Sequence, residues 1–238
     1  MPSLPLSLEN VSLSIGGASL IEDVSLTLHH GPRTIILGAN GAGKSLILRL
    51  SHGLLGPTRG SVRWGGAERL GPLRRRQAMV FQKPIMLRRS TRANAGYGLK
   101  IAGMPRSERE ARVAQVLERV GLARLAERDA RVLSGGEQQK LALARAWALD
   151  PEIMFLDEPT ANLDPTATAA VEAIVNEIHA GGAKIVMTTQ SLSQAKRLAD
   201  EVIFVHRGRV AEQTPADEFF ANPRSAEAAA FLKGELAW

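Results

Sequence analysis

One loop of the sequence has the residue types and spacing that hold a chain of phosphates. Residues 38 to 45 read GANGAGKS, which fits the pattern G-x-x-x-x-G-K-[S/T] between a predicted strand and a predicted helix. Glycines let successive backbone N–H groups point at phosphate oxygens, and a helix that begins near Gly43 adds its positive end. Lys44 is expected to reach the β and γ phosphates, and the Ser45 hydroxyl to bind Mg²⁺. The expected nucleotide contacts in this loop are Gly38, Ala39, Asn40, Gly41, Ala42, Gly43, Lys44, Ser45 and Leu46.

A second group of residues is suited to metal binding and water activation. The segment IMFLDE, residues 153 to 158, is an apolar strand that ends in Asp157 and Glu158. We assign Asp157 to Mg²⁺ coordination, directly or through water, and Glu158 to the general base that polarises the attacking water. Two acidic residues also end strands for purely structural reasons, and this alternative stays open for the pair taken alone. Together with the phosphate loop, the pair indicates nucleotide hydrolysis.

Strands and helices alternate around these two segments. The first 28 residues alternate apolar and polar side chains around Gly16 and Gly17, which is typical of antiparallel strands. A helix is predicted from Lys44 until Gly56 and Pro57. Further strands are predicted at RTIIL, GSVRW, QAMVFQ, EIMFLD and KIVMTT. EVIFVHRGRV predicts a hairpin, and the tail from Pro215 to Trp238 is predicted to be helical.

Residues 83 to 150 interrupt the alternation with three helical segments, TRANAGYGLKIAG, SEREARVAQVLERV and EQQKLALARAWAL. Buried apolar strands separated by helices favour a parallel sheet with helices packed on its faces. We therefore expect an α/β fold in a single domain, 1–238. Its core comprises 1–82, with the antiparallel β part, and 151–238, and a helical subdomain is inserted at 83–150.

Composition narrows the possible functions. A chain of 238 residues with 45% hydrophobic residues can bury a sizeable core. It has no cysteine, which excludes disulfides and thiolate chemistry, and no apolar run approaches the length of a membrane span. The formal net charge is +6, but only 4% of residues are aromatic, so we expect no nucleic acid partner. Basic concentrations at Arg74 to Arg76 and at Arg88, Arg89 and Arg92 are expected to be solvated surface, with docking on a partner as the alternative.

The segment LSGGEQQK at 133 to 140 is the most diagnostic stretch. Ser134, Gly135 and Gly136 form a second donor-rich turn that opens a helix and suits an anion. With the loop at 38 to 45 and IMFLDE, it makes the chain resemble the ATP-binding subunits of ABC transporters over essentially all of its length. The resemblance implies a P-loop NTPase core that binds ATP and Mg²⁺. It also implies that two copies pair head to tail, so that Ser134, Gly135, Gly136 and Glu137 of one copy close over the γ-phosphate held by the other.

Other roles follow from the same resemblance. Gln82, at the end of the predicted strand QAMVFQ, matches the Q-loop glutamine, which contacts Mg²⁺ or the attacking water. The segment ANLD, residues Ala161, Asn162, Leu163 and Asp164, matches the D-loop that communicates across the dimer. For either segment alone, a polar residue at the end of a strand or helix is the simpler interpretation.

The chain departs from the family at two positions. Ile15 stands where the family usually has an aromatic residue that stacks on adenine, so stacking is expected to be weaker. Gln190 stands where the family normally has a histidine that contacts the γ-phosphate. A glutamine amide can donate a hydrogen bond there but cannot carry a charge or transfer a proton. Phosphate sensing can therefore survive while hydrolysis slows; the structural alternative is that Gln190 merely caps the following helix.

The resemblance is strongest to importer subunits of the oxyanion group, in particular tungstate transporters. It implies a second copy, permease subunits and, indirectly, a periplasmic or extracellular substrate-binding protein as partners. No signal peptide is evident in the first ten residues, MPSLPLSLEN, so we expect a peripheral protein at the cytoplasmic face of the bacterial inner membrane. Two alternatives remain open: a soluble ABC ATPase without a role in transport, and a nucleotide switch that hydrolyses slowly because of Gln190.

Overall fold

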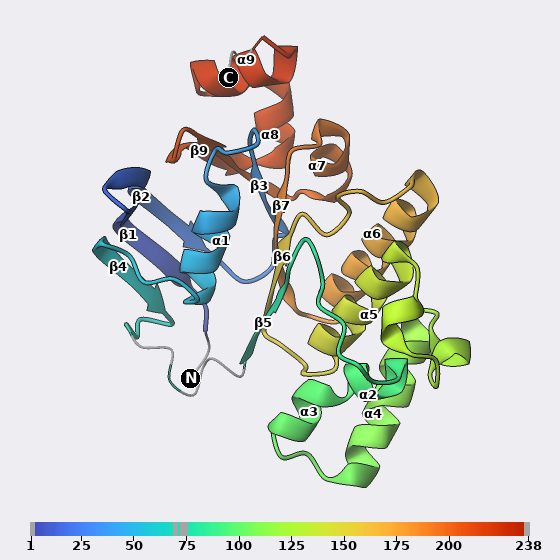
Figure 1. Ribbon diagram of the computed structural model, residues 1–238. Helices are drawn as coiled ribbons and strands as arrows, with labels where there is room; N and C mark the ends of the chain where they lie inside the picture. The colour runs from blue at the N-terminus through green and yellow to red at the C-terminus, as the bar shows by residue number, and fades with distance from the viewer. Residues whose placement is uncertain (1–2, 69–70, 72–75, 236–238) are drawn as a thin grey trace. The chain divides into compact units, whose positions relative to one another are not determined.

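The computed structural model describes residues 3–68, 71 and 76–235. The chain folds into two compact units (Figure 1). The first comprises Met1–Arg74 and Lys184–Trp238, and the second comprises Arg75–Ala183. The predicted helical subdomain at 83–150 lies wholly within the second unit, where it is joined by the two strands and the helix that flank it.

A small antiparallel sheet opens the first unit. Strands β1 (Leu6–Ile15), β2 (Ala18–Leu28) and β4 (Arg59–Trp64) lie in the order β2-β1-β4. The turn between β1 and β2 places Gly16 at φ 58° and Gly17 at φ 86°, a left-handed conformation that favours glycine. The apolar–polar alternation therefore predicted these antiparallel strands correctly.

A second group of strands in the first unit carries the buried core. Strand β3 (Thr34–Leu37) runs parallel to both β7 (Lys184–Thr189) and β8 (Glu201–His206). Every residue of β3 and β7 is buried, which explains why residues 35–37 and 185–187 are all apolar. Strand β9 (Arg209–Pro215) pairs antiparallel with β8, because the tight turn at Arg207 and Gly208 returns the chain alongside it. The sheet is therefore mixed, and not parallel throughout.

A buried polar network ties these strands together. The side chain of Lys184 is 1% exposed, and its ammonium donates to Thr34 Oγ1 at 2.7 Å and to the carbonyl oxygen of Pro32. Thr34 Oγ1 in turn donates to Glu201 Oε2 at 2.7 Å. Burial lowers the pKa of Lys184 to about 8, against the opposing effect of the carboxylates of Glu201 and Asp200.

The helices of the first unit are shorter than the sequence predicted. Helix α1 (Lys44–His52) ends at Gly53, whose φ of 76° lets its N–H donate to the carbonyls of Arg49 and Leu50. The remaining helices are α7 (Leu192–Leu198), α8 (Ala216–Ala221) and α9 (Ala226–Lys233). The predicted helical tail is thus two helices, because the backbone leaves the helical conformation at Asn222, with φ −150°, directly before Pro223. Its last residues, 236–238, lie outside the described residues.

The second unit is mainly helical. Its strands β5 (Gln77–Val80) and β6 (Ile153–Asp157) pair in parallel. Its helices are α2 (Thr91–Ala95), α3 (Tyr97–Ile101), α4 (Arg106–Arg119), α5 (Gly135–Trp147) and α6 (Pro165–Ala180), with short 3-10 turns η2 (Ala123–Leu125) and η3 (Ala130–Val132). The single helix predicted over 91–103 is broken at Gly96, which separates α2 from α3. Across the part of the chain that the structure describes, no helix has the length and apolar character needed to cross a membrane.

Candidate active site

The glycine-rich loop follows β3 directly and leads into α1. Its backbone is left-handed at Gly41, with φ 77°, and at Gly43, with φ 105°. The left-handed φ favours glycine at position 43, and a Cβ atom there would lie 2.7 Å from Ile21 Cδ1, so that the end of the Ile21 side chain would have to move. No hydrogen bond within the described residues is donated by the backbone N–H of Gly41 or Gly43. These donors are therefore available to an anion at the start of α1.

Lys44 adds a positive charge inside the same loop. Its side chain is only 4% exposed, and its Nζ donates to the carbonyl oxygen of Ala39 at 2.8 Å. The ammonium is thus folded back across the loop, on the side where the phosphate chain is expected. The N–H donors, the buried ammonium and the Ser45 hydroxyl at the first turn of α1 together fit a triphosphate.

The turn between β8 and β9 supports this loop. Gly208 donates its N–H to the carbonyl of Ala42 at 2.9 Å, and its own carbonyl accepts from the N–H of Glu22 at 2.9 Å. A Cβ atom at Gly208 would lie 2.5 Å from the carbonyl oxygen of Leu20. The turn is therefore packed between β2 and the phosphate loop without room for a side chain. The sequence predicted the turn but not this contact, because the residues involved are far apart in the chain.

Ile15 and Gln190 also belong to the first unit, and both are exposed. Ile15 ends β1 and is 54% exposed, which fits a side chain available to a ligand. Gln190 follows β7, and its side chain makes no hydrogen bond within the described residues. Ser191 is the N-cap of α7: its Oγ accepts from the N–H of Gln194 at 3.3 Å. The alternative that Gln190 caps this helix is therefore wrong.

The acidic pair lies in the second unit, at the carboxyl end of β6. Asp157 is the last residue of the strand and is 3% exposed. Glu158 adopts φ 44°, a left-handed conformation that costs a non-glycine residue about 1–2 kcal/mol and that often marks functional sites. Carboxylate oxygens are ligands that Mg²⁺ prefers, so Asp157 has suitable chemistry for this ion.

Gln82 lies near the same edge of the parallel strand pair. Strand β5 ends at Val80, which pairs with Leu156, one residue before Asp157. The sequence predicted that the strand would extend to Gln82, but this residue lies two positions beyond its end and is exposed. Because β5 and β6 are parallel, Gln82 leaves the pair at the edge where Asp157 and Glu158 also lie.

The SGGE turn opens α5 with a complete capping box. The Ser134 N–H donates to Glu137 Oε2 at 2.7 Å, and the Glu137 N–H donates to Ser134 Oγ at 3.3 Å. Hydrogen bonds from the Ser134 backbone and hydroxyl lower the pKa of the Glu137 carboxyl. Within the described residues, the N–H groups of Gly135 and Gly136 donate no hydrogen bond. The turn thus combines a stable helix start with free donors for an anion.

The segment ANLD lies beside this turn in the same unit. Asn162 has φ 65°, and Asp164 caps α6 by accepting from the Ala167 N–H at 2.9 Å. A Cβ atom at Gly136 would lie 3.0 Å from Ala167 Cβ, so the missing side chain allows α5 and α6 to pack closely. The structure therefore brings together the SGGE turn and residues 161–164 of one chain, while Asp164 also has a structural role.

A known family model matches more than half of the chain. The sequence model described as "ABC transporter" matches residues 21–161. The chain belongs to the ABC transporter family. The matched segment of this ABC protein contains the phosphate loop, Gln82, the SGGE turn and the pair Asp157–Glu158, and membership implies ATP as the nucleotide.

Individual ABC proteins resemble the chain along most of its length. The tungstate uptake system ATP-binding protein of Peptoclostridium acidaminophilum is 38% identical over 91% of this chain and 100% of its own. The methionine import ATP-binding protein of Brucella suis is 39% identical over 92% of this chain, which spans 62% of that relative's length. The phosphate import ATP-binding protein 2 of Natronomonas pharaonis is 35% identical over 98% of this chain and 88% of its own. These ABC relatives carry different cargoes.

Solved structures of ABC proteins have the same fold. The ATP-binding subunit of an ABC transporter superposes with a TM-score of 0.83 at 27% identity, over 97% of this chain and 99% of the other. The cbiO1 protein of Clostridium perfringens, part of the ABC transporter complex cbiONQ, gives a TM-score of 0.83 at 27% identity over 91% and 90% of the two chains. They confirm the expected α/β fold with an antiparallel β part and a helical segment.

Proposed function

We propose that this ABC protein binds and hydrolyses ATP and thereby energises an importer from the cytoplasmic face of a bacterial membrane. The observation that carries the proposal is the phosphate loop, which combines the buried ammonium of Lys44 with the N–H groups of Gly41 and Gly43, for which the described residues offer no acceptor. Such a loop neutralises the charge of a triphosphate and holds it at the start of α1. Family membership and the ATP-binding relatives support ATP as the nucleotide.

Each site residue has a proposed role in hydrolysis. Lys44 binds the β and γ phosphates, and Glu158 polarises the attacking water as general base. Ser45, Asp157 and Gln82 are the proposed Mg²⁺ ligands, and a bound Mg²⁺ neutralises charge on the phosphate oxygens. Gln190 donates a hydrogen bond to the γ-phosphate through its amide. Ile15 contacts the base without stacking on it.

Transport requires a second copy of the chain. In the proposed dimer, the free N–H groups of Gly135 and Gly136 contact the γ-phosphate bound by the partner copy. ATP then stabilises the closed dimer, and hydrolysis releases it. The residues 161–164 lie beside the SGGE turn, which suits them to transmit this change between copies. Permease subunits convert the movement into transport, and a substrate-binding protein delivers the cargo.

Tungstate or a related oxyanion is the proposed cargo. The tungstate relative, which this chain matches over that relative's full length, supports it. The test is ATP turnover by the complex that co-purifies with the chain in membrane vesicles. Turnover should rise when tungstate-loaded binding protein is added, and phosphate or methionine should not replace tungstate. If turnover rose with methionine or phosphate and not with tungstate, the cargo would be methionine or phosphate, as in the other relatives.

Glu158→Gln tests the hydrolytic mechanism. Removal of a general base should reduce turnover by about 100-fold or more, because such groups contribute about 10² to 10⁴ to the rate. The variant should also form a stable dimer with Mg-ATP, seen by light scattering, whereas Lys44→Ala should remain a monomer. Glu177→Gln is the matched control: it makes the same change on α6, where Glu177 pairs with Arg119, and it should hydrolyse at the parental rate. Parental turnover in Glu158→Gln would refute the general-base role.

A slow nucleotide switch is the second candidate function. The exposed, unbonded side chain of Gln190 favours it, because a histidine would carry the proton-transfer capacity that glutamine lacks. ATP turnover measured with and without the permease separates the two functions. The permease should raise the turnover of an importer ATPase, whereas the turnover of a nucleotide switch should stay slow in both conditions.

A further inference from the structure

Asn40 and Gly41, in the phosphate loop, form the only Asn-Gly pair in the sequence. They occupy the two central positions of a turn, which the Ala42 N–H closes by donating to the carbonyl oxygen of Ala39 at 3.2 Å. Gly41 has φ 77°, and a type II turn requires a positive φ at its second central residue. Both residues are exposed, so the turn presents an asparagine amide and the adjacent glycine N–H to solvent.

An asparagine that is followed by glycine can react with its own backbone. The backbone nitrogen of the glycine loses its proton and attacks the side-chain carbonyl carbon of the asparagine. A nitrogen–carbon bond forms, the bond to the amide nitrogen breaks, and that nitrogen leaves as ammonia, so that a cyclic succinimide remains. One water molecule then opens the ring at either of its carbonyl groups. The product is aspartate, or isoaspartate in which the chain continues through the side chain, and neither an oxidant nor a reductant is needed.

The structure of the loop favours this reaction at Asn40. Within the described residues, the Gly41 N–H donates no hydrogen bond and the Asn40 side chain makes none. A Cβ atom at Gly41 would meet nothing within 4 Å, so the space beside the glycine is open. Lys44 Nζ donates to the carbonyl oxygen of Ala39 in the same turn at 2.8 Å. Its positive charge stabilises the negative charge that develops on the attacking nitrogen and on the amide oxygen.

Asn162 is also exposed but lacks these conditions. It is followed by Leu163, whose N–H donates to the carbonyl oxygen of Thr160 at 3.2 Å. This hydrogen bond must break before the nitrogen can attack, which alone slows the reaction about 2- to 10-fold. The branched side chain of Leu163 crowds the nitrogen further. Asn162 therefore serves as a standard within the same chain.

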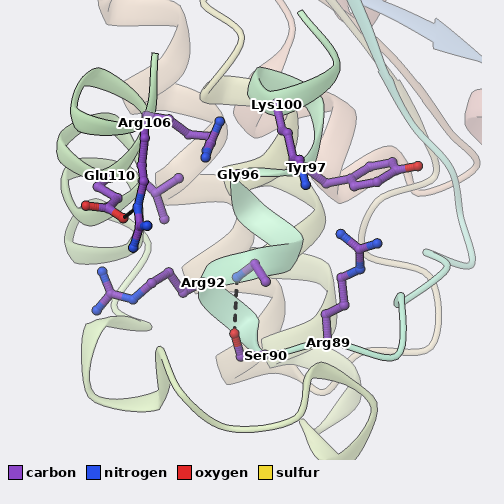
Figure 2. Close-up of a pocket in the computed structure, with 11 residues that line it drawn as sticks. Arg89, Ser90, Arg92, Gly96, Tyr97, Lys100, Arg106 and Glu110 are labelled. Carbon is purple, nitrogen blue, oxygen red and sulfur yellow. Dashed lines mark hydrogen bonds and ion pairs between the residues drawn. The ribbon is translucent and has the colours of Figure 1, made fainter. Parts of the chain in front are cut away.

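Asn94 is protected by its hydrogen bonds. It lies on α2, the short helix that Figure 2 shows between Ser90 and Gly96, and its side chain is fully buried. Its Nδ2 donates to the carbonyl oxygens of Leu87, Arg89 and Ser90, and its Oδ1 accepts from the Leu87 N–H at 2.9 Å. The amide cannot turn toward the next N–H without losing these bonds, so Asn94 is a second standard, for an asparagine that does not react in the folded chain.

We propose that Asn40 is a site of spontaneous modification that a bound nucleotide protects. In the nucleotide-free chain, Asn40 loses ammonia and becomes aspartate or isoaspartate. Either product places a carboxylate in the phosphate loop, where it repels the phosphates, and isoaspartate also lengthens the backbone that holds the N–H donors. A bound triphosphate accepts from the Gly41 N–H and thereby blocks the attacking nitrogen, and this protection rests on the proposed function. Chains that stay empty therefore lose their nucleotide site, and occupied chains keep it.

Peptide mapping by mass spectrometry tests the modification in the full chain. The nucleotide-free protein is incubated at about pH 8, and conversion is measured at Asn40, Asn94 and Asn162 in the same sample. Asn40 should convert at least about tenfold faster than Asn162, because the free nitrogen and the absent side chain of Gly41 act together. Asn94 should stay intact, and conversion of Asn40 should be slower at about pH 6 because the nitrogen must lose its proton. Conversion of Asn40 no faster than that of Asn162 would overturn the proposal.

A non-hydrolysable ATP analogue with Mg²⁺ tests the protection. At ten times its dissociation constant it leaves about one chain in eleven empty, so conversion of Asn40 should fall about tenfold. Lys44→Ala, which should not bind the analogue, should gain no protection. Calorimetry on the fresh chain measures binding separately. If the fresh chain binds the analogue and Asn40 still converts at the free rate, the protection is refuted. If the fresh chain does not bind it, the proposed function fails instead, and the rate ratio between Asn40 and Asn162 still decides the modification.

Variants connect the modification to the loss of binding. Asn40→Asp reproduces one product and should weaken binding of the analogue by about tenfold or more, because a negative charge is added beside the phosphates. Asn222→Asp adds the same charge at the exposed end of α8 and should change the affinity less than about twofold, since solvent screens it. The side chain of Asn40→Gln is too long to form the succinimide, so the affinity of this variant should not fall during incubation, whereas that of the parent should. Parental affinity in Asn40→Asp, with its fold verified by circular dichroism, would contradict the loss of the nucleotide site.

Discussion

Replacement of Gly208 with alanine tests the support of the phosphate loop. At φ 76° the alanine itself costs about 1–2 kcal/mol. Its Cβ atom would also lie 2.5 Å from the carbonyl oxygen of Leu20, and the backbone must shift to relieve this contact. Overpacking of this kind costs about 1–3 kcal/mol, so we expect a total loss of about 2–5 kcal/mol in the free energy of unfolding.

Gly121→Ala is the matched control. Gly121 has φ 72°, close to that of Gly208, but a Cβ atom there meets nothing within 4 Å. This variant should therefore lose only the conformational part, about 1–2 kcal/mol. Urea denaturation followed by tryptophan fluorescence measures both losses under identical conditions.

The backbone shift at Gly208 should also weaken nucleotide binding. Because the Gly208 N–H donates to Ala42 of the phosphate loop at 2.9 Å, displacement of the turn disturbs the N–H donors around the phosphates. We expect the affinity for a non-hydrolysable ATP analogue, measured by calorimetry, to fall about tenfold, equivalent to about 1.4 kcal/mol. Gly121→Ala should bind it as the parent does. If both variants lose the same stability and keep parental affinity, the turn does not support the loop.

Three further predictions concern pH, turnover and capping. The pKa of Lys184 is about 8 in the folded chain against 10.5 ordinarily, so between these pH values the unfolded chain binds more protons and stability should rise with pH. Lys184→Met should remove this rise from urea denaturation curves measured at pH 8 and pH 10, and an unchanged difference would contradict the burial effect. Gln190→His should preserve or raise ATP turnover and add a pH dependence near the histidine range, whereas complete loss of activity would oppose its place near the γ-phosphate. Ser134→Ala should destabilise the nucleotide-free chain by about 1 kcal/mol through loss of the helix cap, and a melting curve identical to that of the parent would exclude the capping contribution.

Local sequence patterns predicted most of the elements. The alternation before residue 28 reflects burial of one face of the strands, and the apolar runs in β3, β6 and β7 reflect burial of both faces. Both patterns can be recognised in the sequence of one strand, without knowledge of the strands that pair with it. Helix ends were less predictable, because they depend on backbone conformation. Gly53 ended α1 before the predicted Gly56, and Gly96 divided the predicted helix of 91–103.

The candidate site was predictable in part for the same reason. The phosphate loop and the acidic pair are contiguous motifs, so their sequence contains the required chemistry. The pattern S-x-x-E at Ser134 also signals the capping box that the structure contains. The contact between Gly208 and Ala42 was not predictable, since it joins segments that only the tertiary fold brings together.

The start of α7 has a consequence for how this chain can change over evolutionary time. Ser191 donates its N–H to Thr189 Oγ1 at 3.0 Å, and its Oγ caps the helix by accepting from the Gln194 N–H. The side chains of Thr189 and Ser191 therefore make the hydrogen bonds that start the helix, and the side chain of Gln190 does not contribute to them. A residue whose side chain does not stabilise the fold can be replaced by single mutations while the protein stays folded. In the proposed mechanism, where Gln190 contacts the γ-phosphate, substitutions at position 190 can change the rate of the nucleotide cycle without first compensating for lost stability.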